Sequence, residues 1–108
     1  MTIQPGEFWV ADIAFTNGIA SKKRPVLVLW LDGNDAVVAV VTSAQPQTRT
    51  DLCLNDWATS GLRVASTVRL SRLVCLTQSL LLGKIGLISP TDTAQAKEIW
   101  QLYIKPQF

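Results

Sequence analysis

The sequence predicts a mainly β protein in which a small, strongly bent sheet closes on itself and one helix follows at the C-terminus. The first observation is a central hairpin, because two nearly continuous apolar runs, 26–30 and 36–43, flank Asp32-Gly33-Asn34-Asp35, a hairpin turn sequence. The second is that the other apolar segments are short and bounded by turn residues. The third is that only residues 89–103 repeat with a helical period. About six short strands and one helix favour a small barrel.

The composition indicates one domain that spans residues 1–108 and buries a core of its own. Only 17% of the residues are charged, so we expect surplus apolar surface at a contact with a second copy. The chain shows no signal-peptide pattern and no apolar run close to the roughly 20 residues of a membrane helix. We therefore expect a cytoplasmic protein with no membrane partner.

Cys53 and Cys75 each lie inside an apolar, strand-like segment. We expect both to be buried free thiols. The chain has no histidine, and two cysteines do not make a zinc site. The sequence therefore predicts no metal site and no other cofactor.

The strands are expected in the following order. Residues 7–15 alternate, with Phe8 on one face and Trp9 and Ala11 on the other. A loop with glycine and lysine residues, 16–23, leads back to the central hairpin, whose strands are apolar on both faces and so belong in the middle of the sheet. Further strands are expected at 50–54, 64–70, 73–76 and 82–88, with a helical turn or loop at 77–81.

The helix is expected to begin after Ser89, which supplies an N-cap, with Pro90 at the first position and Asp92 at the third. One apolar stripe follows at helical spacing and consists of Ala96, Ile99, Trp100 and Tyr103. We expect three of the four tryptophans to be core or subunit contacts, namely Trp9, Trp30 and Trp100.

The central hairpin brings an arginine, Arg24, to a Thr-Ser pair. A loop of Asp32-Gly33, of Gly33-Asn34 or of three residues places Arg24 opposite Val41, Ser43 or Thr42, respectively. Directly paired residues share a sheet face, with Cβ atoms about 5 Å apart. The hairpin therefore predicts an anion site with one guanidinium and one or two hydroxyls. The alternative is a solvated arginine and a Thr-Ser pair that only serves the turn.

The basic residues are unevenly distributed, although the net charge is only +2. The stretch between Asp56 and Asp92 has no acid and contains Arg63, Arg69, Arg72 and Lys84. Together with Lys22, Lys23 and Arg24, these residues supply a basic surface for a polyanion; scattered charges on a solvated rim are the alternative. Trp57 and Phe15 are candidates for stacking on unpaired RNA bases.

Four segments, taken in order, resemble the MazF/PemK-like toxins of bacterial toxin–antitoxin modules, and the similarity covers almost the whole chain. They are Gly6-Glu7-Phe8-Trp9-Val10, the Arg-Pro segment 22–29, Val40-Val41-Thr42-Ser43, and residues 61–86 with Ser66-Thr67-Val68-Arg69-Leu70. The resemblance implies an SH3-like barrel with a C-terminal helix. It also implies a homodimer that acts as a metal-independent ribonuclease toxin on single-stranded RNA.

The same resemblance assigns roles to residues. The family's catalytic arginine falls on Arg24, and its catalytic Thr or Ser falls on Thr42, with Ser43 beside it. Some members carry Arg-x-Asp where this chain has Arg69-Leu70-Ser71, so the arginine is kept and the acid is missing. A small acidic antitoxin is expected to compete with RNA for a basic groove across two subunits, which Lys22, Lys23, Arg63, Arg69 and Arg72 would line or flank.

Cleavage of RNA through its own 2′-hydroxyl needs removal of a proton and stabilisation of charge on a five-coordinate phosphorus. Arg24 suits the second task because a planar guanidinium binds two phosphoryl oxygens at once, and Thr42 or Ser43 can supply another donor. Asp12, Glu7 and the hydroxyls are the nearby candidates for proton transfer. The alternative function is a non-catalytic SH3-like module, such as a decayed toxin, that binds RNA or a protein.

Overall fold

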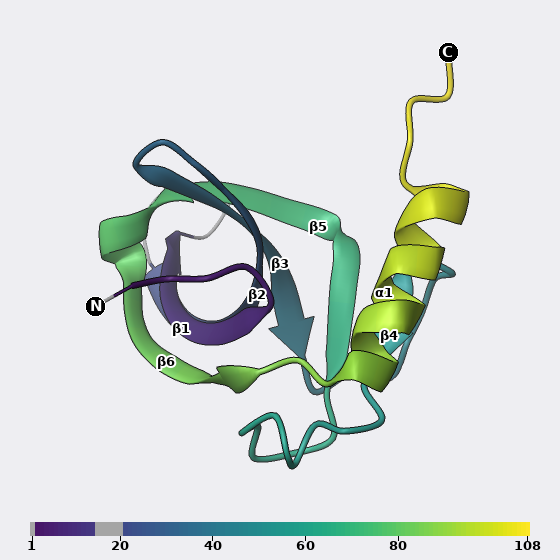
Figure 1. Ribbon diagram of the computed structural model, residues 1–108, viewed down its shortest axis with the longest axis horizontal. Coiled ribbons are helices and arrows are strands. Elements are labelled where there is room, and N and C mark those ends of the chain that lie inside the picture. Colours follow the sequence, from purple (N-terminus) through teal and green to yellow (C-terminus); the bar gives the residue numbers. More distant parts are fainter. Residues whose placement is uncertain (1, 15–20) are drawn as a thin grey trace.

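The computed structural model describes residues 2–14 and 21–108 and shows six strands followed by one α-helix (Figure 1). The strands form one antiparallel sheet in the order β4-β5-β3-β2-β1-β6. The expected central position of the hairpin β2–β3 is thereby confirmed. The elements are β1 (Glu7–Ala14), β2 (Ser21–Asp32), β3 (Asp35–Thr42), β4 (Asp51–Cys53), β5 (Thr67–Thr77), a short 3-10 turn (Gln78–Leu80), β6 (Leu81–Leu87) and α1 (Pro90–Tyr103).

The sheet is curled but open. Figure 1 shows β1, β2 and β6 curving around one side of the molecule, while β4 and α1 lie on the other. In the described part of the chain the ladders end at β4 and at β6, and no hydrogen-bonded ladder joins these two edges. The expected mainly β fold with a C-terminal helix is confirmed. The described strands form a barrel that stays open between β4 and β6.

One long strand, β5, replaces the two neighbouring strands expected at 64–70 and 73–76. Its ladder with β3 shifts register between Ala39 and Val40, opposite residues 70–72. A bulge of this kind bends a strand without ending it, and Figure 1 shows β5 turning a corner between its two halves. The first half therefore pairs with β4 as well as β3, whereas the second half runs on toward β6.

Strand alternation sorts the buried side chains into two core clusters on opposite faces of the sheet. The first core cluster includes Phe8, Leu27, Val41, Leu52, Val68 and Leu70, and Ala96 and Ile99 of α1 pack against it. The second core cluster includes Trp9, Ala11, Val26, Val28, Val38 and Leu76. The predicted faces of β1 and the core position of Trp9 are confirmed.

The prediction that the cysteines are buried is wrong. Cys53 and Cys75 are both free and exposed. On the edge strand β4, Leu52 takes the inward position, which leaves Cys53 pointing outward. On β5, Val74 and Leu76 face the second core cluster, so alternation turns Cys75 to solvent.

The helix begins as predicted, but Asp92 has a different task. The Ser89 hydroxyl accepts a hydrogen bond from the Asp92 N–H at 3.1 Å, and Pro90 is the first helical residue. The Asp92 carboxylate does not form the reciprocal hydrogen bond to Ser89 that a capping box would have. It is fully buried and accepts hydrogen bonds from the N–H groups of Asn55 and Asp56, both at 3.0 Å, so it fastens the loop 54–66 to α1.

The loop 54–66 also lies directly on β6. A Cβ atom at Gly86 would meet the carbonyl oxygen of Ser60 at 2.0 Å, and one at Gly61 would meet the carbonyl oxygen of Ile85 at 2.5 Å. Gly61 moreover has a φ of +94°, a region that glycine tolerates best. Two glycines therefore allow this backbone-to-backbone contact.

Candidate nucleic-acid interface

The hairpin register, extended two residues beyond its last observed pair, puts Arg24 in line with Thr42. The pair Asp32–Asp35 closes a Gly33-Asn34 turn, which by itself predicts Ser43 opposite Arg24. Leu29, however, is an extra residue on β2, since Val28 pairs with Val38 but Trp30 pairs with Val37. This bulge shifts the register by one residue. The last pair of the ladder is Val26–Val40, and continuing the same register two residues further places Arg24 opposite Thr42.

The neighbouring ladders extend this alignment across four strands. Thr42 pairs with Thr67, Val40 pairs with Arg69, and Arg69 pairs with Asp51. Because paired residues and residues two apart on a strand share a face, these side chains continue the face of the second core cluster beyond its buried end. We call them the polar strip, which consists of Arg24, Thr42, Thr67, Arg69 and Asp51.

The candidate catalytic pair lies at the partly exposed end of the strip. Arg24 and Thr42 are both half-buried, and Ser43 is exposed just after the end of β3. The Thr42 hydroxyl oxygen accepts a hydrogen bond from the Ala44 N–H at 3.2 Å. Its own O–H can still donate, so this end of the strip offers one guanidinium and one hydroxyl donor to an anion.

Two members of the strip, Thr67 and Asp51, were not predicted as site residues from the sequence, and Asp51 has the more contacts. Its Oδ1 lies 3.5 Å from Nε of Arg69, and its Oδ2 accepts hydrogen bonds from the N–H groups of Gln47 at 2.9 Å and Thr48 at 3.3 Å. Burial raises the pKa of the Asp51 carboxyl, but the two backbone donors and Arg69 outweigh it, so the pKa is lowered overall. Only the β4–β5 register could have pointed to this residue.

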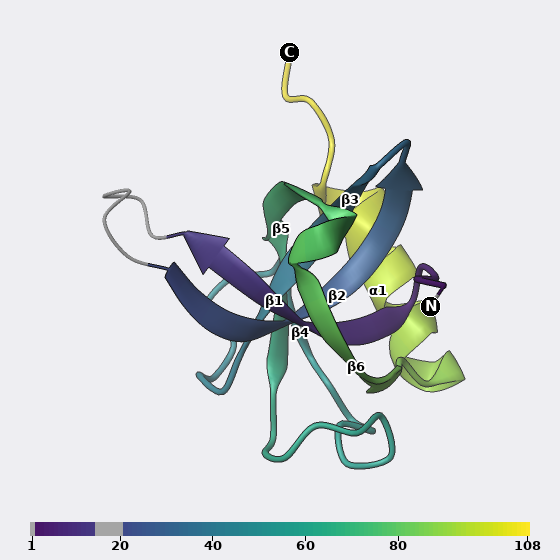
Figure 2. The ribbon, with the colours of Figure 1, turned by 90° about the vertical axis from the view of Figure 1, so that its left-hand side faces the viewer.

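The remaining basic candidates lie around the strip. Lys22 and Lys23 are exposed on β2 opposite Ile13 and Asp12 of β1, where the two strands run side by side away from the rest of the sheet (Figure 2). By alternation Lys22 shares the face of Arg24 and Lys23 has the other face. Arg72 is exposed at the bend of β5.

Other candidates are placed elsewhere. Arg63 is exposed in the loop 54–66, and Trp57 packs against the first core cluster, on the sheet face opposite the strip. Lys84 forms an ion pair with Glu7 at 2.7 Å. Glu7 is buried and also accepts from the Trp9 ring N–H and the Gln4 N–H; its pKa is lowered, mainly by Lys84. Phe15 lies outside the described residues.

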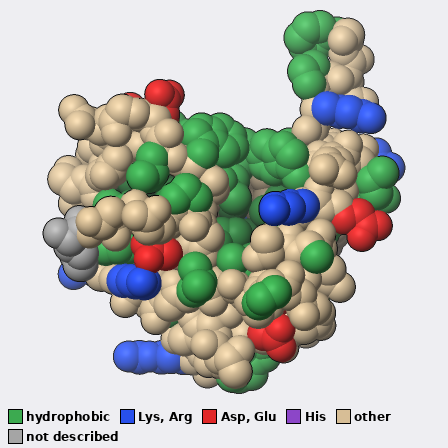
Figure 3. Space-filling model, viewed as in Figure 1, with side chains coloured by type: hydrophobic (Ala, Val, Ile, Leu, Met, Phe, Trp, Pro, Cys, Tyr) green, Lys and Arg blue, Asp and Glu red, His purple; other side chains and the backbone are tan. Residues whose placement is uncertain are grey.

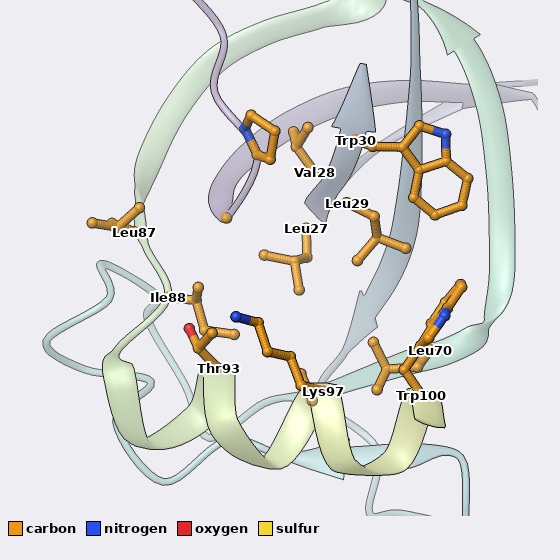
Figure 4. A pocket seen from close by; sticks show the side chains of 13 residues that line it. Leu27, Val28, Leu29, Trp30, Leu70, Leu87, Ile88, Thr93, Lys97 and Trp100 are labelled. Atoms are coloured by element: carbon orange, nitrogen blue, oxygen red, sulfur yellow. The ribbon is translucent and has the colours of Figure 1, made fainter. Parts of the chain in front are cut away.

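A second feature is an apolar groove of about 540 Å³ between β2, the end of β6 and α1. Figure 3 shows apolar side chains gathered in this hollow, and Figure 4 shows Leu27, Leu29, Ile88 and Trp100 around it. Trp30 stands at its rim, 42% exposed, with its ring edge-to-face to Trp100 at 5.9 Å. Among the described residues that line the groove, Lys97 is the one that carries a charge.

Two further structural properties concern metals and membranes. The described residues contain no group of three or more His, Cys, Asp or Glu side chains placed to hold a metal ion. No helix within the described ranges is long and apolar enough to cross a bilayer.

The fold and the strip define a class of protein: a small open β-barrel with a C-terminal helix that presents cations and hydroxyls at one end of its central strands. The family model of the PemK-like, MazF-like toxins of type II toxin–antitoxin systems matches residues 4–103. The chain therefore belongs to this toxin family. No curated protein sequence matches the chain.

Solved structures share the fold at low sequence identity. A mycobacterial endoribonuclease in complex with its cognate antitoxin has a TM-score of 0.74 at 14% identity, over 91% of this chain and 90% of that one. MazF in a MazE–MazF structure from Deinococcus radiodurans has 0.73 at 17% identity, over 94% and 96%. The Mycobacterium tuberculosis toxin MazF-mt6 has 0.66 at 20% identity, over 86% and 93%.

Proposed function

We propose that this toxin is an endoribonuclease that cleaves single-stranded RNA through the 2′-hydroxyl without a metal ion. The observation that carries the proposal is the polar strip, in which the β2–β3 register, extended two residues beyond Val26–Val40, places Arg24 and Thr42 on one sheet face. Arg69 lies one row further on the same face. This arrangement suits a phosphodiester at Arg24 and Thr42, with a neighbouring phosphate at Arg69.

In the proposed step the 2′-hydroxyl gives its proton to solvent as its oxygen attacks phosphorus, the P–O2′ bond forms, the bond to the 5′-oxygen breaks, and the 5′-oxygen takes up a proton from solvent. Arg24 binds two phosphoryl oxygens and stabilises the charge that develops there. The Thr42 hydroxyl donates a hydrogen bond to a phosphoryl oxygen. The hydroxyl of Ser43, which is exposed just after the end of β3, is a further donor beside it. The products are a 2′,3′-cyclic phosphate and a 5′-hydroxyl.

We further propose that the protein is a homodimer inhibited by a small acidic antitoxin. Three features support this partner. Two of the structures with the same fold are antitoxin complexes, the strip and its surroundings are basic, and the apolar groove has Lys97 in its lining. An antitoxin segment with apolar side chains and nearby acids complements both surfaces. RNA and antitoxin then compete, and salt weakens both.

The deciding experiment incubates the purified protein with a defined single-stranded RNA, with and without EDTA. We expect cleavage that persists in EDTA, cyclic phosphate ends, and resistance of a substrate with a 2′-deoxy residue at the scissile site. A 3′-hydroxyl product or a requirement for magnesium would contradict the mechanism. RNA binding without cleavage would instead favour the non-catalytic module, and sedimentation of a monomer at micromolar concentration would contradict the homodimer.

A further inference from the structure

We infer that Asp51 is a positioning residue for RNA binding, which holds the guanidinium of Arg69 and the turn that follows Thr42 and Ser43. The inference rests on the proposed function and deepens it. It assigns to the RNA-binding face a buried carboxylate that no motif in the sequence marks.

The geometry shows one carboxylate with two separate tasks. Oδ2 of Asp51 accepts the N–H groups of Gln47 and Thr48, which belong to the segment between β3 and β4. Oδ1 is buried, has no hydrogen-bond partner among residues 2–14 and 21–108, and lies 3.5 Å from Nε of Arg69. The Asp51 side chain is 2% exposed and that of Arg69 is 25% exposed. Because an unpaired buried carboxylate is strongly unfavourable, the Arg69 charge is needed beside Oδ1.

This contact prepares Arg69 for a second partner. An arginine held at Nε keeps its two terminal amino groups for a bidentate contact with a phosphate. A long side chain that is oriented before binding loses less conformational entropy when the RNA arrives. Asp51 thus strengthens the RNA contact of Arg69, although its own charge is negative.

The position of Ser71 supports the same reading. Ser71 stands where some relatives carry the acid after this arginine, and its hydroxyl accepts a hydrogen bond from Thr50 at 2.9 Å. Thr50 directly precedes Asp51. The carboxylate next to Arg69 is therefore supplied from β4, across the ladder, and not from β5 itself.

The test exploits opposite expectations for one substitution. Asp51→Asn removes a negative charge, so simple electrostatics predicts tighter RNA binding. The asparagine oxygen still accepts from Gln47 and Thr48, but its NH2 group then faces Nε of Arg69, donor against donor. We expect the dissociation constant for a nuclease-resistant 2′-O-methyl oligonucleotide to rise about 3- to 10-fold, the cost of ordering one long side chain.

Three further variants isolate the cause. Glu98→Gln removes the same charge from an exposed site on α1 and should leave binding unchanged or slightly tighter. Arg69→Lys keeps the charge but lacks Nε, so it should weaken binding even if Asp51→Asn does not fold. In an Arg69→Ala background, Asp51→Asn should cause no further loss, because its effect passes through Arg69.

The outcomes separate the two proposals. A wild-type protein that binds no RNA overturns the proposed function, and this inference with it. A wild type that binds, with an Asp51→Asn variant that binds equally well or better, overturns the inference alone. So does a loss of equal size in the Arg69→Ala background, since Asp51 would then act through the fold. Nitrogen-15 spectra should show the Arg69 Nε resonance shift in Asp51→Asn, because a neutral amide replaces the carboxylate beside it.

Discussion

Asp92 gives the sharpest test of how the loop 54–66 is held. We expect Asp92→Ala to lower the free energy of unfolding by about 3–4 kcal/mol. The buried carboxylate accepts two backbone N–H groups at 3.0 Å, and a hydrogen bond to a charged group contributes about 1.5–3 kcal/mol. Two of them sum to about 3–6 kcal/mol, and the lower half of that range applies because Asn55 is exposed and water can replace its acceptor.

Urea unfolding followed by tryptophan fluorescence measures this change, and Trp57 in the same loop is a local reporter. For a domain of about 100 residues, the expected loss lowers the melting temperature by more than about 10 °C. Glu98→Ala, which removes an exposed acid from the same helix, is the control and should change stability by less than about 0.5 kcal/mol. A loss below about 1 kcal/mol in Asp92→Ala would refute the role assigned to this carboxylate.

Three other predictions follow from the site and the fold. Arg24→Ala should lower RNA cleavage about 10²–10³-fold or more without changing the circular dichroism spectrum, and Arg24→Lys should restore little; a folded Arg24→Ala enzyme with the wild-type rate would remove the assignment. Gly86→Ala should destabilise strongly, since its Cβ would lie 2.0 Å from a carbonyl oxygen of the loop, whereas Gly83→Ala meets nothing within 4 Å and should be tolerated; equal melting temperatures would contradict this. The lowered pKa values of Glu7 and Asp51 stabilise the fold fully above their unfolded values of 4.5 and 3.8, and this contribution is lost as the pH falls through the lower folded values; unfolding at pH 2–5 should therefore be less pH-dependent in Glu7→Gln.

The features predicted correctly are those that short stretches of sequence determine. The central hairpin followed from its turn and its apolar runs, and the helix start followed from Ser89 and Pro90. The inward side of β1 followed from alternation, which placed Trp9 in a core cluster. Each of these signals lies within one continuous segment of the chain, so no knowledge of strand order was needed.

The features that escaped prediction depend on contacts between distant segments. Asp51 gains its meaning only from the β4–β5 register, and Asp92 from a loop more than thirty residues away. Cys53 and Cys75 sit in apolar segments, yet their neighbours take the inward positions. Composition can identify a strand, but it cannot say which of two adjacent residues faces the core when both are apolar.

The extra residue at Leu29 has a consequence for how this chain can vary in length. The turn half of the hairpin keeps the register of the Gly33-Asn34 turn, and the half that carries Arg24 is offset by one residue. Deleting Leu29 would remove the bulge and join Val28 directly to Trp30, which keeps the pairs Val28–Val38 and Trp30–Val37 and leaves Arg24 in line with Thr42. An extra residue inserted between Arg24 and Val28 would instead move Arg24 opposite Ser43 and turn it to the other face of the sheet. Functional variants should therefore tolerate the loss of a residue at the bulge better than the gain of a residue before it.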